Sequence, residues 1–253
     1  MSALLRALHP VVPPEELAGV WRADQLARPQ QAVLASGHAE LDAELPGGGW
    51  PIGQLTEVLQ VQPGLFEWRL LLPALKAAVA RGPLVLIGAP HLPHLPALVA
   101  AGIPTAQLLR VDAQTPAERL WAAEQVLRCR ELGALLAWLP QARPEQLRRL
   151  QLASTATQAL VFAFRPELAR HESSPAPLRL TLCAAADEAG AMTQGLSVEL
   201  LKRRGPHIDH PVTLAAPLPV MAALRKRRPP KDSGHAVDRP ATPRTARRQL
   251  QSA

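Results

Sequence analysis

A short strand that runs through a glycine loop into a helix restricts the fold of this chain more than any other stretch. Residues 55 to 59 are β-prone and alternate in character, Gly64 follows them, and apolar residues then recur at helical spacing at Leu71, Leu75 and Val79. In such a unit, backbone N–H groups and the positive end of the helix dipole converge on one point. This geometry is typical of sites that bind nucleotide phosphates.

The residues that handle phosphate chemistry are missing from this loop. A phosphate loop needs Lys for the β- and γ-phosphates, and Ser or Thr for Mg²⁺, at the start of the helix. Residues 64 to 69 read GLFEWR, which places two aromatic rings and a carboxylate that would repel an anion where phosphate would bind. We therefore predict a degenerate phosphate loop at Gly64, Phe66, Glu67 and Trp68, with no nucleotide cofactor, no metal and no catalytic residue.

Strands and helices alternate through most of the chain that follows. Apolar runs such as ALLAWL at residues 134–139 show no alternation, as expected for strands that are covered on both faces. This order predicts an α/β fold with a mainly parallel sheet, built from right-handed βαβ units and flanked by helices. The expected strands cover residues 84–88, 107–111, 134–139 and 159–164, and the expected helices cover residues 96–101, 116–132 and 144–157.

The boundaries of the middle helix are the most explicit. Thr115 is a good N-cap, Pro116 fits the first helical position, and Glu118 places an acid in the first turn. Gly133 marks the expected end of that helix.

The pattern changes towards the C-terminus. Residues 178–184 (LRLTLCA) and 196–202 (LSVELLK) both alternate, with a turn-prone stretch between them. This predicts an antiparallel hairpin appended to the sheet, and residues 210–214 are expected to add a further strand.

Composition and charge divide the chain into three parts. Residues 221 to 253 hold nine Lys and Arg against two Asp, so this tail accounts for the whole formal net charge of +7. The tail is rich in Pro and Arg and too poor in apolar residues to order itself. We predict an N-terminal arm at 1–35, an α/β domain at 36–219, and a disordered basic tail at 220–253. Trp21 in the arm is a candidate anchor onto the body or onto a partner.

Cysteine usage and hydropathy point to a cytoplasmic protein. Cys129 and Cys183 are the only cysteines, and without CxxC spacing they are expected to be small buried residues in a reducing compartment. Arg6 and several prolines interrupt the apolar N-terminus, so we expect no signal peptide. Residues 82 to 109 lack acidic and basic side chains, but five prolines break the run, which argues against a membrane span.

Metal and hydrolase sites have weak support. The pairs His91 with His94 and His207 with His210 have ligand-like spacing, but no Cys or acid completes a set of four ligands. Ser36 lies near His38, and Ser197 follows Gly195, yet neither fits the nucleophile elbow of a hydrolase. We expect loop histidines and ordinary hydroxyls at these positions.

The pattern GxxxLDxxLPGGGWPxGxLTE at residues 37–57, together with LLLPAL at 70–75 and KRRGP at 202–206, gives the chain a family resemblance. The succession of elements resembles the RecA-like core. More closely, residues 20 to 217 resemble the ImuA proteins, which are SulA- and RecA-like accessory factors of SOS-induced translesion DNA synthesis.

The resemblance also shows what an ATPase would need and this chain lacks. Pro90 replaces the glutamate that activates water in recombinases, residues 135–140 (LLAWLP) lack the acid that holds Mg²⁺, and Phe164 and Arg165 replace the sensor of the γ-phosphate. Together with the loop, four parts are missing. We therefore expect apolar side chains, including Trp138 and Phe164, to fill the nucleotide site.

Basic residues form two candidate contact regions for DNA or for a protein partner. One closes the second strand of the hairpin, at Lys202, Arg203 and Arg204, and both phosphate contacts and ion pairs are open there. The other region lies in the tail and includes Arg225, Lys226, Arg227, Arg228, Arg247 and Arg248. The tail lacks aromatic residues, which argues against base stacking.

The resemblance implies a non-catalytic accessory protein of error-prone translesion synthesis. Its implied partners are a Y-family-like polymerase homologue of the ImuB type, an error-prone DNA polymerase III alpha-type subunit, and RecA. Two alternatives stay open at this point. One is a SulA-like inhibitor of cell division, and the other is a divergent RecA-like ATPase that uses Arg69 or Lys76.

Overall fold

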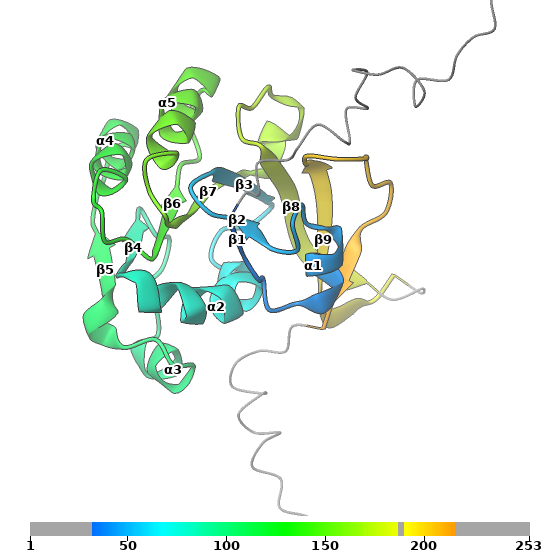
Figure 1. The fold of residues 1–253 in the computed structure, drawn as a ribbon. Coiled ribbons are helices and arrows are strands. Elements are labelled where there is room, and N and C mark those ends of the chain that lie inside the picture. The colour runs from blue at the N-terminus through cyan, green and yellow to red at the C-terminus, as the bar shows by residue number, and fades with distance from the viewer. Residues whose placement is uncertain (1–31, 187–189, 216–253) are drawn as a thin grey trace, which may run out of the picture.

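The computed structural model describes residues 32–186 and 190–215, and it is a mixed α/β structure with a mostly parallel central sheet (Figure 1). Eight strands follow the order β10-β9-β8-β3-β7-β6-β4-β5 across this sheet. Six of them, from β8 to β5, run parallel, as predicted. Their bounds are β3 Leu55–Gln60, β4 Leu84–Ile87, β5 Leu108–Val111, β6 Ala134–Trp138, β7 Leu160–Pro166, β8 Leu178–Ala186, β9 Met192–Lys202 and β10 Val212–Leu214.

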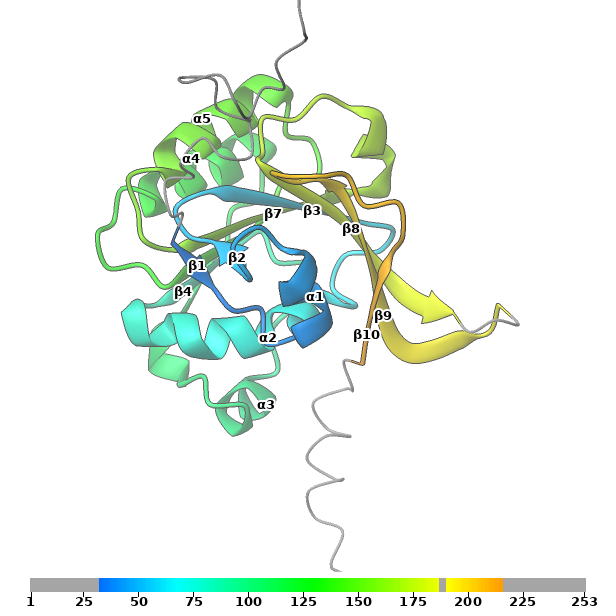
Figure 2. The ribbon, with the colours of Figure 1, turned by 45° about the vertical axis from the view of Figure 1, so that its right-hand side comes forward.

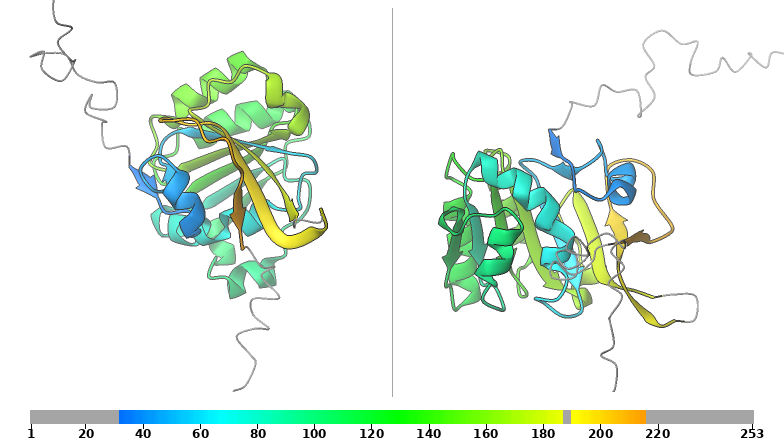
Figure 3. Two further views of the ribbon diagram at one scale, coloured as in Figure 1. Left: turned by 90° about the vertical axis from the view of Figure 1, so that its right-hand side faces the viewer. Right: turned by 90° about the horizontal axis from the view of Figure 1, so that it is seen from below.

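Helices cover both faces of the sheet (Figure 3, left). Helices α2 (Glu67–Ala78) and α3 (Leu95–Ala100) lie on one face, and α4 (Pro116–Val126) and α5 (Pro144–Ser154) lie on the other. Strand β4 shows why its run is apolar throughout: Leu84 and Leu86 belong to one buried cluster, while Val85 and Ile87 belong to the other. In the described part of the chain, short 3-10 helices complete the connections, namely η2 Val79–Arg81, η3 Thr105–Gln107 and η4 Glu167–His171.

The C-terminal hairpin is confirmed. Strand β8 pairs parallel with β3, β9 returns antiparallel to β8, and β10 adds antiparallel to β9. On the same side of the molecule, β1 (Val33–Leu34) pairs with β2 (Trp50–Pro51), and α1 (Ala39–Glu44) lies against β10 (Figure 2). Strand β1 falls within the arm predicted at residues 1–35, and residues 1–31 of that arm lie outside the described residues.

Two helices end several residues before the predicted position: α5 ends at Ser154 rather than at residue 157, and α4 differs more. The capping box at Thr115 and Glu118 is present, but α4 ends at Val126 rather than near residue 132. The chain then tightens into i→i−3 turns that lead back to β6. Gly133 serves this return, because a Cβ there would overlap the carbonyl oxygens of Gly82 and Ala78.

The expectation for the cysteines was wrong, because both Cys129 and Cys183 are exposed. Cys183 points outward from β8, and Cys129 lies in the turn after α4. The predicted anchor Trp21 and the predicted contact residues of the basic tail lie outside the described residues. Within residues 32–186 and 190–215, no helix is long and apolar enough to cross a membrane.

Candidate functional site

The glycine loop joins β3 to α2 at the carboxyl edge of the sheet. Gly64 has a φ of +91°, a conformation that glycine adopts without strain. A side chain there would also overlap the ring of His91, which packs against the loop from the segment after β4. Both the backbone conformation at position 64 and the packing of His91 therefore require glycine.

The Glu67 side chain fills this loop from within. Its Oε1 accepts hydrogen bonds from Gly64 N and Gln60 Nε2, both at 2.7 Å, and from Trp138 Nε1 at 2.9 Å. Its Oε2 accepts from Phe66 N at 3.1 Å, and the residue is 1% exposed. Backbone N–H groups at a helix start are the groups that bind a phosphate in a functional loop. Here they bind the carboxylate of the same chain.

The two aromatic residues of the loop lie elsewhere. Phe66 and Trp68 are partly buried and pack against the apolar core on the α2 face. The guanidinium of Arg69 lies 5.8 Å from the centroid of the Phe66 ring, and Arg69 also donates to Gln194 O. Lys76 lies beside Gly102, which follows α3. In this arrangement the Arg69 guanidinium is bound to β9, and Lys76 lies towards the end of α3.

The prediction that apolar side chains fill the nucleotide site was wrong, because a cavity of about 470 Å³ remains at the carboxyl ends of β3 to β7. Trp138 and Phe164 stack on each other at 4.6 Å between ring centroids, so they form a wall and do not fill the space. Pro63, Pro90 and Pro140 line other parts of the cavity. Rigid, compact prolines cannot reach across a space of this size.

Cationic and polar groups line the side of the cavity near β5 and α4. Arg119 donates from Nε to Ala113 O at 3.1 Å, and Arg110 lies 3.3 Å from Asp112. Gln114 also donates to Asp112, at 3.0 Å. The cavity is thus apolar on one side and carries guanidinium groups on the other.

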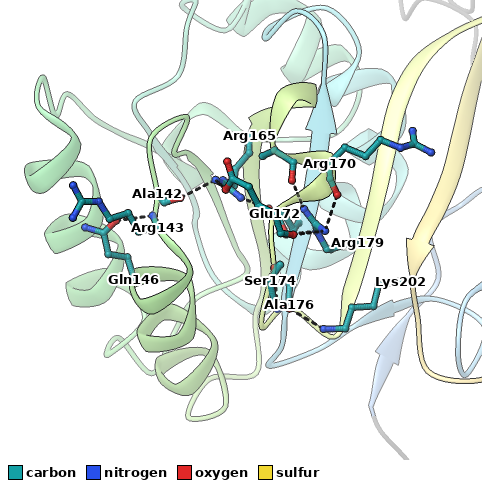
Figure 4. Close-up of polar contacts among 12 residues, drawn as sticks. Ala142, Arg143, Gln146, Arg165, Arg170, Glu172, Ser174, Ala176, Arg179 and Lys202 are labelled. Atoms are coloured by element: carbon teal, nitrogen blue, oxygen red, sulfur yellow. Dashed lines mark hydrogen bonds and ion pairs between the residues drawn. The ribbon is translucent and has the colours of Figure 1, made fainter.

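A buried ionic network, which was not predicted from the sequence, lies in the middle of the sheet. Glu57 on β3 is fully buried and pairs with Arg165 at 2.8 Å and with Arg179 at 2.6 Å. Arg165 also contacts Glu172 at 2.7 Å and Ala142 O at 2.8 Å (Figure 4). Burial opposes the charged form of Arg165, but its bonds to Glu172 and Glu57 raise its pKa. The signal was a charged residue within each of three apolar strands.

The same network fixes η4 and the residues after it. Arg179 donates to the carbonyl oxygens of Ala169 at 2.8 Å, Arg170 at 3.3 Å and Glu172 at 3.1 Å (Figure 4). Arg170 in turn pairs with Glu199 of β9, which lowers the pKa of that carboxyl group. These contacts give the network a structural role.

The basic cluster at the end of β9 is largely engaged within the protein. Lys202 donates to Ser174 O at 2.9 Å (Figure 4). Arg203 donates to Pro206 O at 2.9 Å and reaches Glu44 of α1. Both residues tie β9 to neighbouring segments, and Arg204 also has an interaction partner.

Several of the weaker candidates have partners of their own among the described residues. His38 lies 3.0 Å from Leu70 O, and its backbone N donates to Ser36 Oγ, so this pair shapes a turn. His207 pairs with Asp209 at 3.3 Å. Among the described residues, no group of three His, Cys, Asp or Glu side chains could hold a metal ion.

Neither a scan of models of known protein families nor a search of curated proteins finds a match to this chain.

Proposed function

We propose that this protein is a non-catalytic accessory factor of SOS-induced, error-prone translesion DNA synthesis, built on a RecA-like scaffold. Its partners would be an ImuB-type polymerase homologue, an error-prone DNA polymerase III alpha-type subunit, and RecA. The observation that carries the proposal is the Glu67 carboxylate, which occupies the N–H groups of the glycine loop. It supports a nucleotide-motor architecture without nucleotide turnover.

The strand ends support the same proposal. Pro90 stands after β4, and Pro140 stands after β6, where a RecA-like enzyme would place its base and its metal-binding acid. A proline side chain can neither accept a proton nor bind Mg²⁺. A scaffold of this kind can act through its surfaces, and surfaces that fit a RecA-like subunit would let it meet RecA or a relative.

The basic segments have different roles in this proposal. Lys202 and Arg203 stabilise the end of β9, so partner or DNA contacts fall more readily to the tail at residues 220–253. The proposal leaves direct DNA contact open. It places the protein in the cytoplasm with the replication machinery.

The test is co-purification of the full chain with each polymerase subunit, with RecA and with the tubulin-like division protein. We expect the polymerase subunits to be recovered. Recovery of the division protein alone would favour the SulA-like alternative. The experiment repeated on a chain that ends at residue 220 tells whether the contact lies in the tail or on the body.

Nucleotide binding provides a second, independent test. We expect calorimetry to detect no ATP binding at the glycine loop at millimolar nucleotide with Mg²⁺, because Glu67 holds the donors that phosphate would need. Micromolar affinity that is lost on substitution of Gly64 would support the divergent ATPase instead.

A further inference from the structure

The cavity at the carboxyl edge of the sheet has polar groups that neither the glycine loop nor the ionic network uses. It measures about 470 Å³, within the range of about 300–1,000 Å³ that small-molecule sites occupy. In open sheets of parallel strands, ligands bind outside the carboxyl ends of the strands. The N–H groups of Gly64 and Phe66 are bound to Glu67, and residues 64–68 do not line the cavity, so the groups that could hold a ligand lie on the opposite wall.

Arg119 is the principal group on that wall. Its Nε is bound to Ala113 O, and among the described residues its terminal nitrogens have no hydrogen bond or ion pair. The guanidinium rests on Gly88, where a Cβ would lie 2.7 Å from Nε. Gly88 has a φ of +64°, so a side chain is disfavoured there by both backbone and space. The position of Arg119 is therefore set while its anion-binding edge stays available.

Arg110 supplies a second cation that a ligand can recruit. Its contact with Asp112 is 3.3 Å long, and the Asp112 side chain is 65% exposed. Exposed pairs of this kind contribute little energy, so Arg110 can turn to a ligand at small cost. Arg165 also lines the cavity, but its charge is matched by Glu57 and Glu172. The uncompensated charge of the cavity is positive and lies at Arg119.

The facing wall carries Pro63, Pro90 and Pro140. The stacked Trp138 and Phe164 rings lie behind them and reach the cavity only at their margins, since they are 5% and 1% exposed. We propose that the cavity binds a small organic anion, with its carboxylate or phosphate group on Arg119 and Arg110 and a compact apolar body against the prolines of the facing wall. Guanidinium groups bind both kinds of oxyanion through paired hydrogen bonds.

Calorimetry of the full-length protein at fixed ionic strength tests the site with three probes of one shape. Phenyl phosphate and benzoate carry the two kinds of anion, and phenol carries none. We expect saturable binding of at least one anion with a dissociation constant of about 1 mM or tighter, and no saturable binding of phenol. The tighter of the two anions identifies the head group that the natural ligand carries.

Two variants and a control locate the site. Arg119→Gln should weaken binding about tenfold or more, because a charged hydrogen-bond partner is lost. Gly88→Ala keeps every charge but displaces the guanidinium, so it should also weaken binding. Arg149→Gln removes a guanidinium that is 67% exposed and paired with Glu124 between α5 and α4, and it should leave the affinity unchanged.

Three results would overturn the proposal. They are no saturable binding of either anion, equal binding by the wild type and Arg119→Gln, and an equal loss in Arg149→Gln. Circular dichroism confirms that each variant is folded. The outcome is independent of the co-purification experiment, because the cavity can bind a ligand whichever protein partners the chain has.

Discussion

Removal of the Glu67 carboxylate should destabilise the protein and create an anion site in the glycine loop. Glu67→Ala leaves four donors without their acceptor: Gly64 N, Phe66 N, Gln60 Nε2 and Trp138 Nε1. A hydrogen bond to a charged group contributes about 1.5–3 kcal/mol. Four independent losses would be an upper bound, because water from the adjoining cavity can replace part of the carboxylate. We expect a loss of about 3–5 kcal/mol, the magnitude seen when a buried charged partner is removed.

Denaturant unfolding followed by circular dichroism measures this loss. Glu145→Ala is the matched control, because Glu145 also lies in the first turn of a helix but is exposed. It should cost less than about 1 kcal/mol, the size of a helix-dipole contribution. Glu67→Gln keeps the size of the side chain and one acceptor oxygen, so its cost should fall between the two.

Sulfate should then substitute for the missing carboxylate. At ten times its dissociation constant, sulfate would restore about 1.4 kcal/mol to Glu67→Ala by mass action. Chloride at the same ionic strength should restore much less, and the wild type should gain less from sulfate than the variant does. A loss below about 1 kcal/mol, or an equal gain from sulfate in both proteins, would refute the role assigned to Glu67.

Three further predictions concern the network and the caps. Glu57→Gln should lower the free energy of unfolding in denaturant by about 3–5 kcal/mol, because it leaves the buried guanidinium groups of Arg165 and Arg179 without their shared carboxylate. An unchanged free energy of unfolding would show that water solvates these groups. Thr115→Ala should lower the free energy of unfolding by about 0.5–2 kcal/mol, since it removes the cap of α4. Thermal unfolding of this variant beside Thr115→Ser, which keeps a capping hydroxyl, checks this. Arg170 lowers the pKa of Glu199, so that pair contributes stability above the unfolded pKa of about 4.3 and loses it as the pH falls through the folded pKa. The free energy of unfolding should therefore fall less steeply between about pH 5 and pH 3 in Arg170→Gln than in the wild type, by less than about 1 kcal/mol. An equal pH dependence in the two proteins would contradict the role of the Arg170–Glu199 pair.

The strands and their order of appearance could be predicted because burial on both faces leaves a mark in the sequence. The run LVLI at residues 84–87 is apolar throughout, and its side chains divide between the two buried clusters. The alternation of apolar and polar residues at 178–184 and 196–202 likewise predicted the hairpin. The end of α4 could not be predicted from Gly133. This glycine is required by its close approach to Gly82 and Ala78, and not because a helix ends there.

The role of Glu67 could be predicted only in part. Its position at a helix start predicted that it would repel an anion, but its contact with Trp138 spans 71 residues and depends on how β3 and β6 are arranged. The network around Glu57 spans 108 and 122 residues in the same way. No pattern in the sequence predicts the cavity, because its presence depends on Trp138 stacking against Phe164 and not filling the site.

Glu67 also connects the loop to the cavity, and this connection bears on how such a scaffold can act. Trp138 donates to Glu67 through its indole N–H while its ring stacks on Phe164, so one residue joins the carboxylate to the cavity wall. In a nucleotide motor the loop and the strand ends are joined through a phosphate that comes and goes. Here they are joined through a side chain that cannot leave. The donors at Gly64 and Phe66 are therefore bound to the chain itself, as the proposed non-catalytic accessory role requires.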